Sequence, residues 1–112
     1  MTRHDPKVSF LQMQDTVNEI ASLTQNKTHD DLAKDRVLNL ALTRLLEVLG
    51  EAATRVPEET RKNYPELPWK QVISLRNRLI HAYDQVDLEI LWEIVSVDLP
   101  PLSKQLDLII QN

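Results

Sequence analysis

Apolar residues recur every three or four positions along most of this 112-residue chain, which is the spacing of one face of an α-helix. The first such segment follows Asp5-Pro6, a pair typical of a helix N-cap and first helical position. Gln25-Asn26-Lys27 is polar and ends it. The pattern predicts a first helix over residues 6–24, with an apolar face of Phe10, Met13, Val17, Ile20 and Leu23.

A second, longer helix is predicted from Thr28 to about residue 56. Thr28 and Asp31 resemble a capping box, in which two side chains satisfy backbone N–H groups reciprocally. The apolar residues form two stripes, one of Leu38, Leu42, Leu45, Leu49 and Ala52 and one of Val37, Ala41, Val48 and Leu49. A helix apolar on two faces needs two neighbours, so we expect a second copy of the chain, in a homodimer. Gly50 is about 1 kcal/mol less favourable than alanine in a helix, which indicates close approach of another backbone.

Prolines punctuate the chain after residue 56. Pro57 ends the second helix, residues 58–64 predict a short helical turn, and Pro65 and Pro68 predict a rigid corner. A third helix is predicted from Pro68-Trp69 to about residue 83, and a short loop over residues 84–87 follows it.

The last quarter of the chain predicts a helix that is kinked or restarted. Asp87 is expected to cap a fourth helix. Pro100 and Pro101 fit the first turn of a helix, so we expect a restart capped by Asp98 and continuing to the C-terminus. The whole pattern predicts an all-α, up-and-down bundle of four to five helices in one domain, residues 1–112.

Composition agrees with a helical bundle and excludes several other classes. The chain has one glycine, 4% aromatic residues and no cysteine, which argues against a β-sandwich, a disulfide scaffold and a thiolate metal site. Residues 1–6 lack the apolar region of a signal peptide, and no apolar run reaches the roughly 18 residues that span a bilayer. We therefore expect a cytoplasmic protein that does not enter the membrane.

Charge is distributed unevenly along the sequence. The chain carries a net charge of −4, yet residues 55–81 carry +3, between −2 in residues 1–54 and −5 in residues 82–112. The basic segment runs into Arg76, Arg78, His81 and Tyr83, which are concentrated within eight positions. A local basic patch of this kind attracts phosphate even on an acidic protein.

These side chains suit cleavage of RNA by its own 2′-hydroxyl. An imidazole, with an ordinary pKa near ~6.5, can act as general acid or base, while a guanidinium binds the scissile phosphate. This chemistry needs neither metal nor cofactor. Arg76 and His81 lie about 140° apart around a helix, so one active site needs a second wall, which a symmetric dimer provides.

Other interpretations of these residues remain open. The dipole at a helix C-terminus favours arginine and histidine there without any catalysis. The three histidines show no metal-ligand spacing, and a Ser74, His81 and Asp84 triad lacks the strand-to-helix turn that exposes a nucleophile. Trp69 and Trp92 are most simply core or interface residues.

Five blocks of the chain, taken together and in order, resemble the HepT-like proteins of the HEPN superfamily. They are residues 46–53 (LEVLGEAA), 64–69 (YPELPW), 76–83 (RNRLIHAY), 86–92 (VDLEILW) and 98–102 (DLPPL). The third block fits the Arg-x4–6-His-x-Tyr motif of that superfamily. Asp84 follows the motif tyrosine, where an aromatic residue is frequent.

The resemblance implies a homodimeric HEPN bundle with the motif in a cleft at the dimer interface. It implies the toxin of a type VII-like toxin–antitoxin system, a metal-independent ribonuclease acting on cellular RNA. Arg76 and His81 would be catalytic, with Asn77 and Arg78 in support. The antitoxin would be a minimal nucleotidyltransferase, MNT, that transfers AMP to Tyr83 or neutralises the toxin by binding. The acidic net charge and Asp84 keep a second hypothesis open: a noncatalytic dimeric module that docks or regulates a nucleotidyltransferase.

Overall fold

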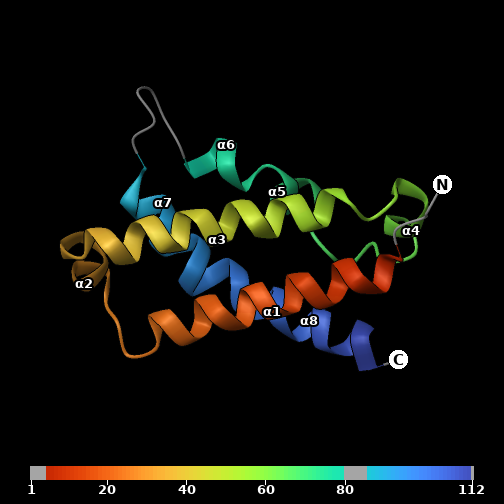
Figure 1. Cartoon of the computed structure of the whole chain (residues 1–112), viewed down its shortest axis with the longest axis horizontal. Helices are drawn as coiled ribbons and strands as arrows, with labels where there is room; N and C mark the ends of the chain where they lie inside the picture. The colour runs from red at the N-terminus through yellow and green to blue at the C-terminus, as the bar shows by residue number, and fades with distance from the viewer. Residues whose placement is uncertain (1–4, 80–85, 112) are drawn as a thin grey trace.

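The computed structural model describes residues 5–79 and 86–111, and the regular elements of these residues are all helices. Four helical layers run alternately up and down the long axis (Figure 1). They are α1 (Pro6–Thr24), α3 (Arg36–Thr54), the pair α5 (Trp69–Ile73) and α6 (Leu75–Leu79), and a last layer of α7 (Leu88–Glu93), the π-helical turn η2 (Ile94–Asp98) and α8 (Leu99–Gln111). Short helices α2 (His29–Lys34) and α4 (Glu58–Arg61) lie at opposite ends of the bundle. The predicted all-α, up-and-down bundle is confirmed.

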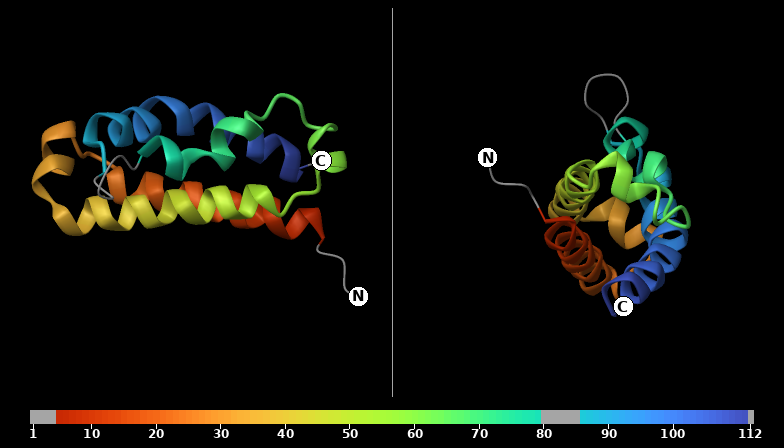
Figure 2. Two further views of the ribbon diagram at one scale, coloured as in Figure 1. Left: turned by 90° about the horizontal axis from the view of Figure 1, so that it is seen from above. Right: turned by 90° about the vertical axis from the view of Figure 1, so that its right-hand side faces the viewer.

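All four layers contribute side chains to one core, and the end-on view in Figure 2 shows the layers arranged around a common axis. α1 packs against α3 and α8, and α3 packs also against α5 and α6. The fully buried side chains are mainly aliphatic and include Met13, Ile20, Leu42, Leu46, Leu49, Leu79, Leu91, Ile94 and Leu106. No helix within residues 5–79 and 86–111 is long and apolar enough to cross a membrane.

The first helix has the predicted bounds. Asp5 caps it by accepting a hydrogen bond from the backbone N–H of Lys7 at 2.9 Å, and Pro6 occupies the first turn. Four of the five predicted apolar residues are buried, but Leu23 in the last turn is 38% exposed. The periodic pattern therefore located this helix correctly and overestimated its apolar face by one residue.

The prediction of one continuous second helix is wrong, because the structure has two helices there, α2 and α3. The capping box is present, because Thr28 Oγ1 accepts from Asp31 N at 3.2 Å and Asp31 Oδ2 accepts from Thr28 N at 2.9 Å. However, α2 ends at Lys34, and Asp35 has extended dihedral angles and caps α3 by accepting from Leu38 N at 3.0 Å. Aspartate stabilises a cap better than a helix interior, so Asp35 divides the segment into two helices.

Hydrogen bonds from Thr28 lower the pKa of the Asp31 carboxyl group. The folded-state pKa is therefore below the unfolded value. The stabilisation that the charged capping box gives is present above the unfolded pKa and is lost as the pH falls through the lowered one.

The predicted third helix is interrupted at Ser74, which separates α5 from α6. The Ser74 hydroxyl donates to Lys70 O at 2.7 Å, and the residue has φ −96° and ψ 15°. A serine hydroxyl bonded to the carbonyl four residues earlier often bends a helix, but Thr16 and Thr43 make the same bond within α1 and α3, so this bond alone does not break the helix. The predicted continuation of this helix past Leu79, and the first half of the predicted loop over residues 84–87, lie outside the described residues.

A kinked or restarted helix was predicted for the last layer, and α7, η2 and α8 follow one another there without a gap. Asp87 caps α7 as expected, accepting from Ile90 N at 3.1 Å, and Pro100 and Pro101 lie in the first turn of α8. The predicted cap by Asp98 is wrong, because Asp98 lies within η2 and Leu99 N–H bonds to Ile94 O across a π-turn. The π-turn joins α7 to α8 without a break and leaves the Asp98 carboxylate available for another partner.

Gly50 lets the backbone of α5 approach α3 closely, as its position in the helix predicted. A methyl group at Gly50 would lie 3.1 Å from the carbonyl oxygen of Val72 and 3.5 Å from that of Ile73. Both neighbours are backbone atoms, which move only with the whole helix. Gly50 therefore sets the distance between α3 and the α5–α6 layer.

Gly50→Ala is expected to lower the free energy of unfolding by about 1 kcal/mol. Overpacking against a backbone costs about 1–3 kcal/mol, which exceeds the gain of about 1 kcal/mol in helix propensity. Urea unfolding followed by circular dichroism measures the difference. Ala21→Gly, at an exposed position within α1, gives the propensity effect alone. A Gly50→Ala protein more stable than the wild type would contradict the close approach.

Candidate active site

Helix α6 carries three of the predicted site residues on different faces. Arg76 and Arg78 are two residues apart and thus about 200° apart around the helix. Arg76 faces α3, whereas Arg78 faces η2. Asn77 lies between them and is exposed. Of these three residues, only Arg76 has an exposed guanidinium that lies beside α3.

Arg76 is held loosely at the surface. Its side chain is 59% exposed, and its Nε lies 3.8 Å from Oε2 of Glu47 on α3. Glu47 also lies 3.5 Å from Arg44, which lies 3.5 Å from Glu51. Exposed pairs at these distances contribute little to stability, so a phosphate can replace Glu47 as the partner of Arg76.

A hollow of about 150 Å³ lies beside Arg76. Its walls come from α3 and the end of α5, and the close approach at Gly50 brings these two helices together. The residues that line it are Leu46, Glu47, Gly50, Glu51, Thr54, Ile73 and Arg76. The hollow thus offers one guanidinium against two carboxylates, and a bound phosphate must displace Glu47 from Arg76.

Arg78 is occupied by partners in the last layer. Its NH1 donates to Oδ2 of Asp98 at 2.8 Å, and its NH2 lies 3.9 Å from Oε1 of Glu93. The side chain is 34% exposed. This contact holds α6 against η2 and so fixes the helix that carries Arg76.

The predicted residues His81, Tyr83 and Asp84 lie outside the described residues. The chain on either side of them is fixed, because Leu79 O accepts a hydrogen bond from Asp87 N at 2.9 Å. Leu79 is fully buried, and Asp87 caps α7. The chain therefore leaves and re-enters the described structure at one place, at the end of the helix that carries Arg76.

The other candidate residues have structural contacts. His29 Nε2 lies 3.0 Å from Oε1 of Glu89, and its ring meets Trp92 edge to face with centroids 6.3 Å apart. Trp69 and Trp92 are partly buried against the core. The Ser74 hydroxyl donates to a backbone carbonyl. Within residues 5–79 and 86–111, no group of three histidine, aspartate or glutamate residues can hold a metal ion.

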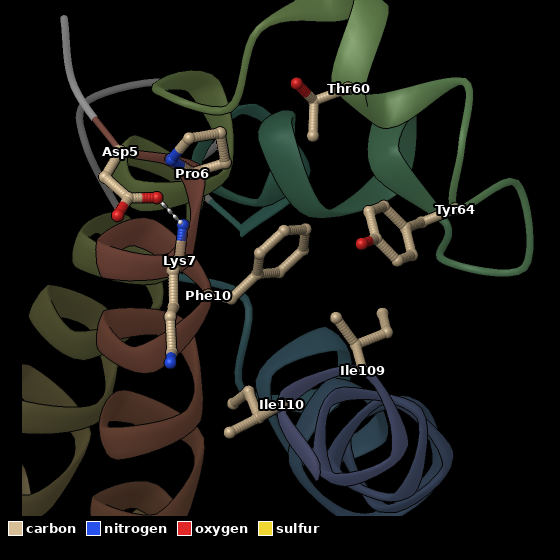
Figure 3. A pocket seen from close by; sticks show the side chains of 8 residues that line it. All are labelled: Asp5, Pro6, Lys7, Phe10, Thr60, Tyr64, Ile109 and Ile110. Carbon is tan, nitrogen blue, oxygen red and sulfur yellow. Dashed lines mark hydrogen bonds between the residues drawn. The ribbon is translucent and has the colours of Figure 1, made fainter. Parts of the chain in front are cut away.

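A separate pocket of about 320 Å³ opens at the other end of the bundle (Figure 3). Phe10, Tyr64, Ile109 and Ile110 form its apolar walls, and the Phe10 and Tyr64 rings meet edge to face with centroids 5.2 Å apart. Tyr64 thus packs against the first helix, beside the proline corner. The described lining of this pocket contains no arginine or histidine, so it does not suit the phosphate chemistry expected of the motif.

Sequence reasoning missed the charged residues of α3 that surround Arg76. Glu47 precedes Arg76 by 29 positions, and pattern alone does not pair residues so far apart. Glu47 and Glu51 do lie in the block 46–53 that supported the family resemblance. Blocks 46–53 and 76–83 were each recognised in the sequence, but only the fold shows that they lie side by side on one surface.

Comparison with known proteins gives a consistent result over nearly the whole chain. A family model described as "Ribonuclease HepT-like" matches residues 13–109. "Putative RNase MJ0127" of Methanocaldococcus jannaschii is 34% identical over 112 residues, covering 100% of this chain and 93% of that protein. "Probable ribonuclease HepT" of Thermococcus cleftensis is 34% identical over 89 residues, covering 80% and 81%. No solved structure gives a significant match.

Proposed function

The chain belongs to the family of HepT-like ribonucleases, and we propose that it is a metal-independent endoribonuclease that cleaves cellular RNA with Arg76 and His81. The RNA 2′-hydroxyl attacks the neighbouring phosphorus while the bond to the 5′-oxygen breaks. The products are a 2′,3′-cyclic phosphate and a free 5′-hydroxyl. His81 either accepts the proton of the 2′-hydroxyl or donates a proton to the leaving 5′-oxygen, and water carries out the other proton transfer. Arg76 offsets the negative charge that develops on the phosphoryl oxygens.

The exposed guanidinium of Arg76 is the observation that best supports this proposal. Arg76 lies in the first turn of α6, and its nearest described carboxylate, that of Glu47, is 3.8 Å away. A structural arginine is bound as Arg78 is, at 2.8 Å from a carboxylate. The difference indicates that Arg76 is available to a substrate and that Arg78 serves the fold.

A homodimer completes the proposed site. Val37, Ala41, Arg44, Val48 and Glu51 follow one another on α3 at alternating spacings of four and three, which places them on one face. Val37 is 77% exposed, and neighbouring Leu40 is 50% exposed. Arg44 on this face contacts Glu47, the partner of Arg76. A second chain packed on this face borders Arg76 and supplies the second wall of the cleft.

We further propose that the protein is the toxin of a toxin–antitoxin pair. Inducible expression without the antitoxin is then expected to arrest growth within a few generations, because cleaved RNA stops protein synthesis. An Arg76→Ala/His81→Ala protein, expressed to the same level, is the matched control and is expected to be harmless. Colony counts and total RNA profiles measure the effect. Equal arrest by both proteins would contradict the proposal.

The proposed antitoxin is a minimal nucleotidyltransferase that transfers AMP to Tyr83. The tyrosine oxygen bonds to the α-phosphorus of ATP, and pyrophosphate leaves. A phosphodiester and a nucleoside on the motif then compete with RNA for Arg76. Incubation with the antitoxin and ATP is expected to raise the intact mass by whole AMP units and to inhibit cleavage. A Tyr83→Phe protein modified to the same extent would exclude Tyr83 as the acceptor.

A noncatalytic module that docks a nucleotidyltransferase is the second candidate function. Glu47 and Glu51 favour it, because they place carboxylates beside the arginine that would bind phosphate. The expression experiment separates the two candidates. Harmless expression of the wild-type chain, together with tight binding of the nucleotidyltransferase, would support the module.

A further inference from the structure

We propose that the groove between α4 and α5 binds the single-stranded stretch of RNA that adjoins the scissile phosphate. This inference rests on the proposed ribonuclease function and adds the path that the substrate follows. The groove has a volume of about 540 Å³ and extends to Ser74, where α5 meets α6. Its principal lining residues are Arg61, Lys62, Trp69, Lys70 and Ile73.

The groove is basic although the protein is acidic. Arg61, Lys62 and Lys70 line it against a single carboxylate, that of Glu58. Lys62 and Lys70 are exposed, and neither has an ion-pair partner among the described residues. Unpaired lysines that converge on a groove attract a phosphate backbone and release counterions when they bind it.

An ordered aromatic side chain forms one wall of the groove. Trp69 Nε1 donates to Tyr64 O at 3.0 Å, which fixes the ring. Arg61 is fixed as well, because it donates to the carbonyl oxygens of Val56 at 2.9 Å and Thr54 at 3.1 Å. Its guanidinium carbon lies 5.9 Å from the centroid of the Trp69 ring. A fixed tryptophan beside cations is the arrangement with which proteins bind single strands, by stacking a base and neutralising its phosphate.

The groove leads to Arg76. Ile73 lines both the groove and the hollow beside Arg76, so the two depressions adjoin. Lys70 and Arg76 are six residues apart along the α5–α6 layer, a rise on the order of 9 Å. An RNA strand that lies across Lys70 and Trp69 therefore continues to Arg76. An acidic protein segment is the competing occupant, but a peptide gains less than a nucleotide base from the tryptophan wall.

The first test measures binding of a fluorescent, mixed-sequence RNA oligonucleotide to the full chain carrying His81→Ala, which keeps the RNA intact. Adding Lys62→Gln and Lys70→Gln is expected to reduce the slope of log affinity against log salt by about 1.4, or about 0.7 for each lost phosphate contact on a single strand. Lys27→Gln with Lys34→Gln changes the net charge equally at the other end of the bundle. Equal slopes for the two double variants would overturn the proposal.

The second test uses Trp69 as a reporter. Trp92→Phe leaves Trp69 as the one tryptophan of the chain, and RNA is expected to quench its emission. When Lys62 and Lys70 are both glutamine, the same quenching is expected to need about tenfold more RNA. If RNA at saturating concentrations leaves the emission of the single-tryptophan protein unchanged, the proposal that a base stacks on Trp69 is overturned.

Cleavage kinetics separate this inference from the function on which it rests. In the catalytically intact chain, Lys62→Gln with Lys70→Gln is expected to raise KM about tenfold and leave kcat unchanged, because the groove binds substrate and transition state alike. If cleavage depends on His81 but its KM is unchanged in this variant, the proposed RNA groove is overturned and the ribonuclease function stands. A wild-type chain that neither binds nor cleaves RNA would overturn both proposals. Loss of antitoxin binding with unchanged RNA binding would assign the groove to a protein partner instead.

Discussion

Replacing His81 with alanine is expected to reduce metal-free RNA cleavage by about 10²–10⁴-fold, the usual contribution of a positioned general acid or base. The imidazole is the one group of the motif that exchanges a proton near neutral pH. Its removal leaves the guanidinium of Arg76 to bind the phosphate, so RNA binding should persist. Initial rates on a labelled RNA, measured with EDTA present, give the size of the effect.

His29→Ala is the matched control for this substitution. His29 is paired with Glu89 and packs against Trp92, so its loss should leave the cleavage rate unchanged. Wild-type and His81→Ala preparations that digest RNA equally would show that the activity comes from a contaminant. A rate that needs added divalent metal in the wild type would contradict the metal-independent mechanism.

The long helices of the bundle were predictable because local rules and the core agree in them. Asp5 and Pro6 start α1 in the expected way, and its apolar face meets α3 and α8. Gly50 was informative for the opposite reason. A residue that weakens a helix needs a compensating contact, and the carbonyl of Val72 supplies it.

The breaks between helices were not predictable from apolar spacing. Asp35 interrupts a segment whose periodicity continues through it, because its carboxylate caps α3. Ser74 separates α5 from α6, but its hydroxyl bond to Lys70 O does not explain the break by itself, because Thr16 and Thr43 make the same bond within unbroken helices. Asp98 was expected to cap a new helix, but it lies within the continuous π-helical turn η2, and its carboxylate accepts a hydrogen bond from Arg78 instead. At Asp35 and Asp98 the outcome depends on a competing partner for the carboxylate.

The candidate site was predictable only on the motif side. Arg76 was identified from its spacing to His81 and from the family resemblance, and its exposure agrees with a substrate-binding role. Glu47 approaches Arg76 through the packing of α6 on α3, which spacing along the chain does not reveal. Lys62 and Lys70 were noticed as part of a basic segment, but their convergence on Trp69 required the fold.

Replacing Arg76 with alanine is expected to lower kcat/KM for RNA by about 10²–10³-fold, the usual effect of removing one preorganised donor to a transition-state oxyanion. Arg76→Lys should recover part of the loss, because an ammonium keeps the charge but cannot present two parallel N–H groups to a phosphate. Arg55→Ala is the control for net charge, since Arg55 donates to Gln12 on α1. It should cleave RNA at the wild-type rate.

Glu47→Gln should change the kinetics in the opposite direction, because Glu47 and the RNA phosphate compete for the same guanidinium. The expected result is a KM lowered by a few-fold, a gain that disappears when Arg76 is already alanine. The double-mutant cycle of Arg76→Ala and Glu47→Gln measures this coupling. If Glu47→Gln instead lowers kcat as much as Arg76→Ala does, the carboxylate takes part in catalysis and the competition model is wrong. If neither substitution changes cleavage, Arg76 does not bind the scissile phosphate, and the resemblance of its motif to a ribonuclease site carries no catalytic meaning in this chain.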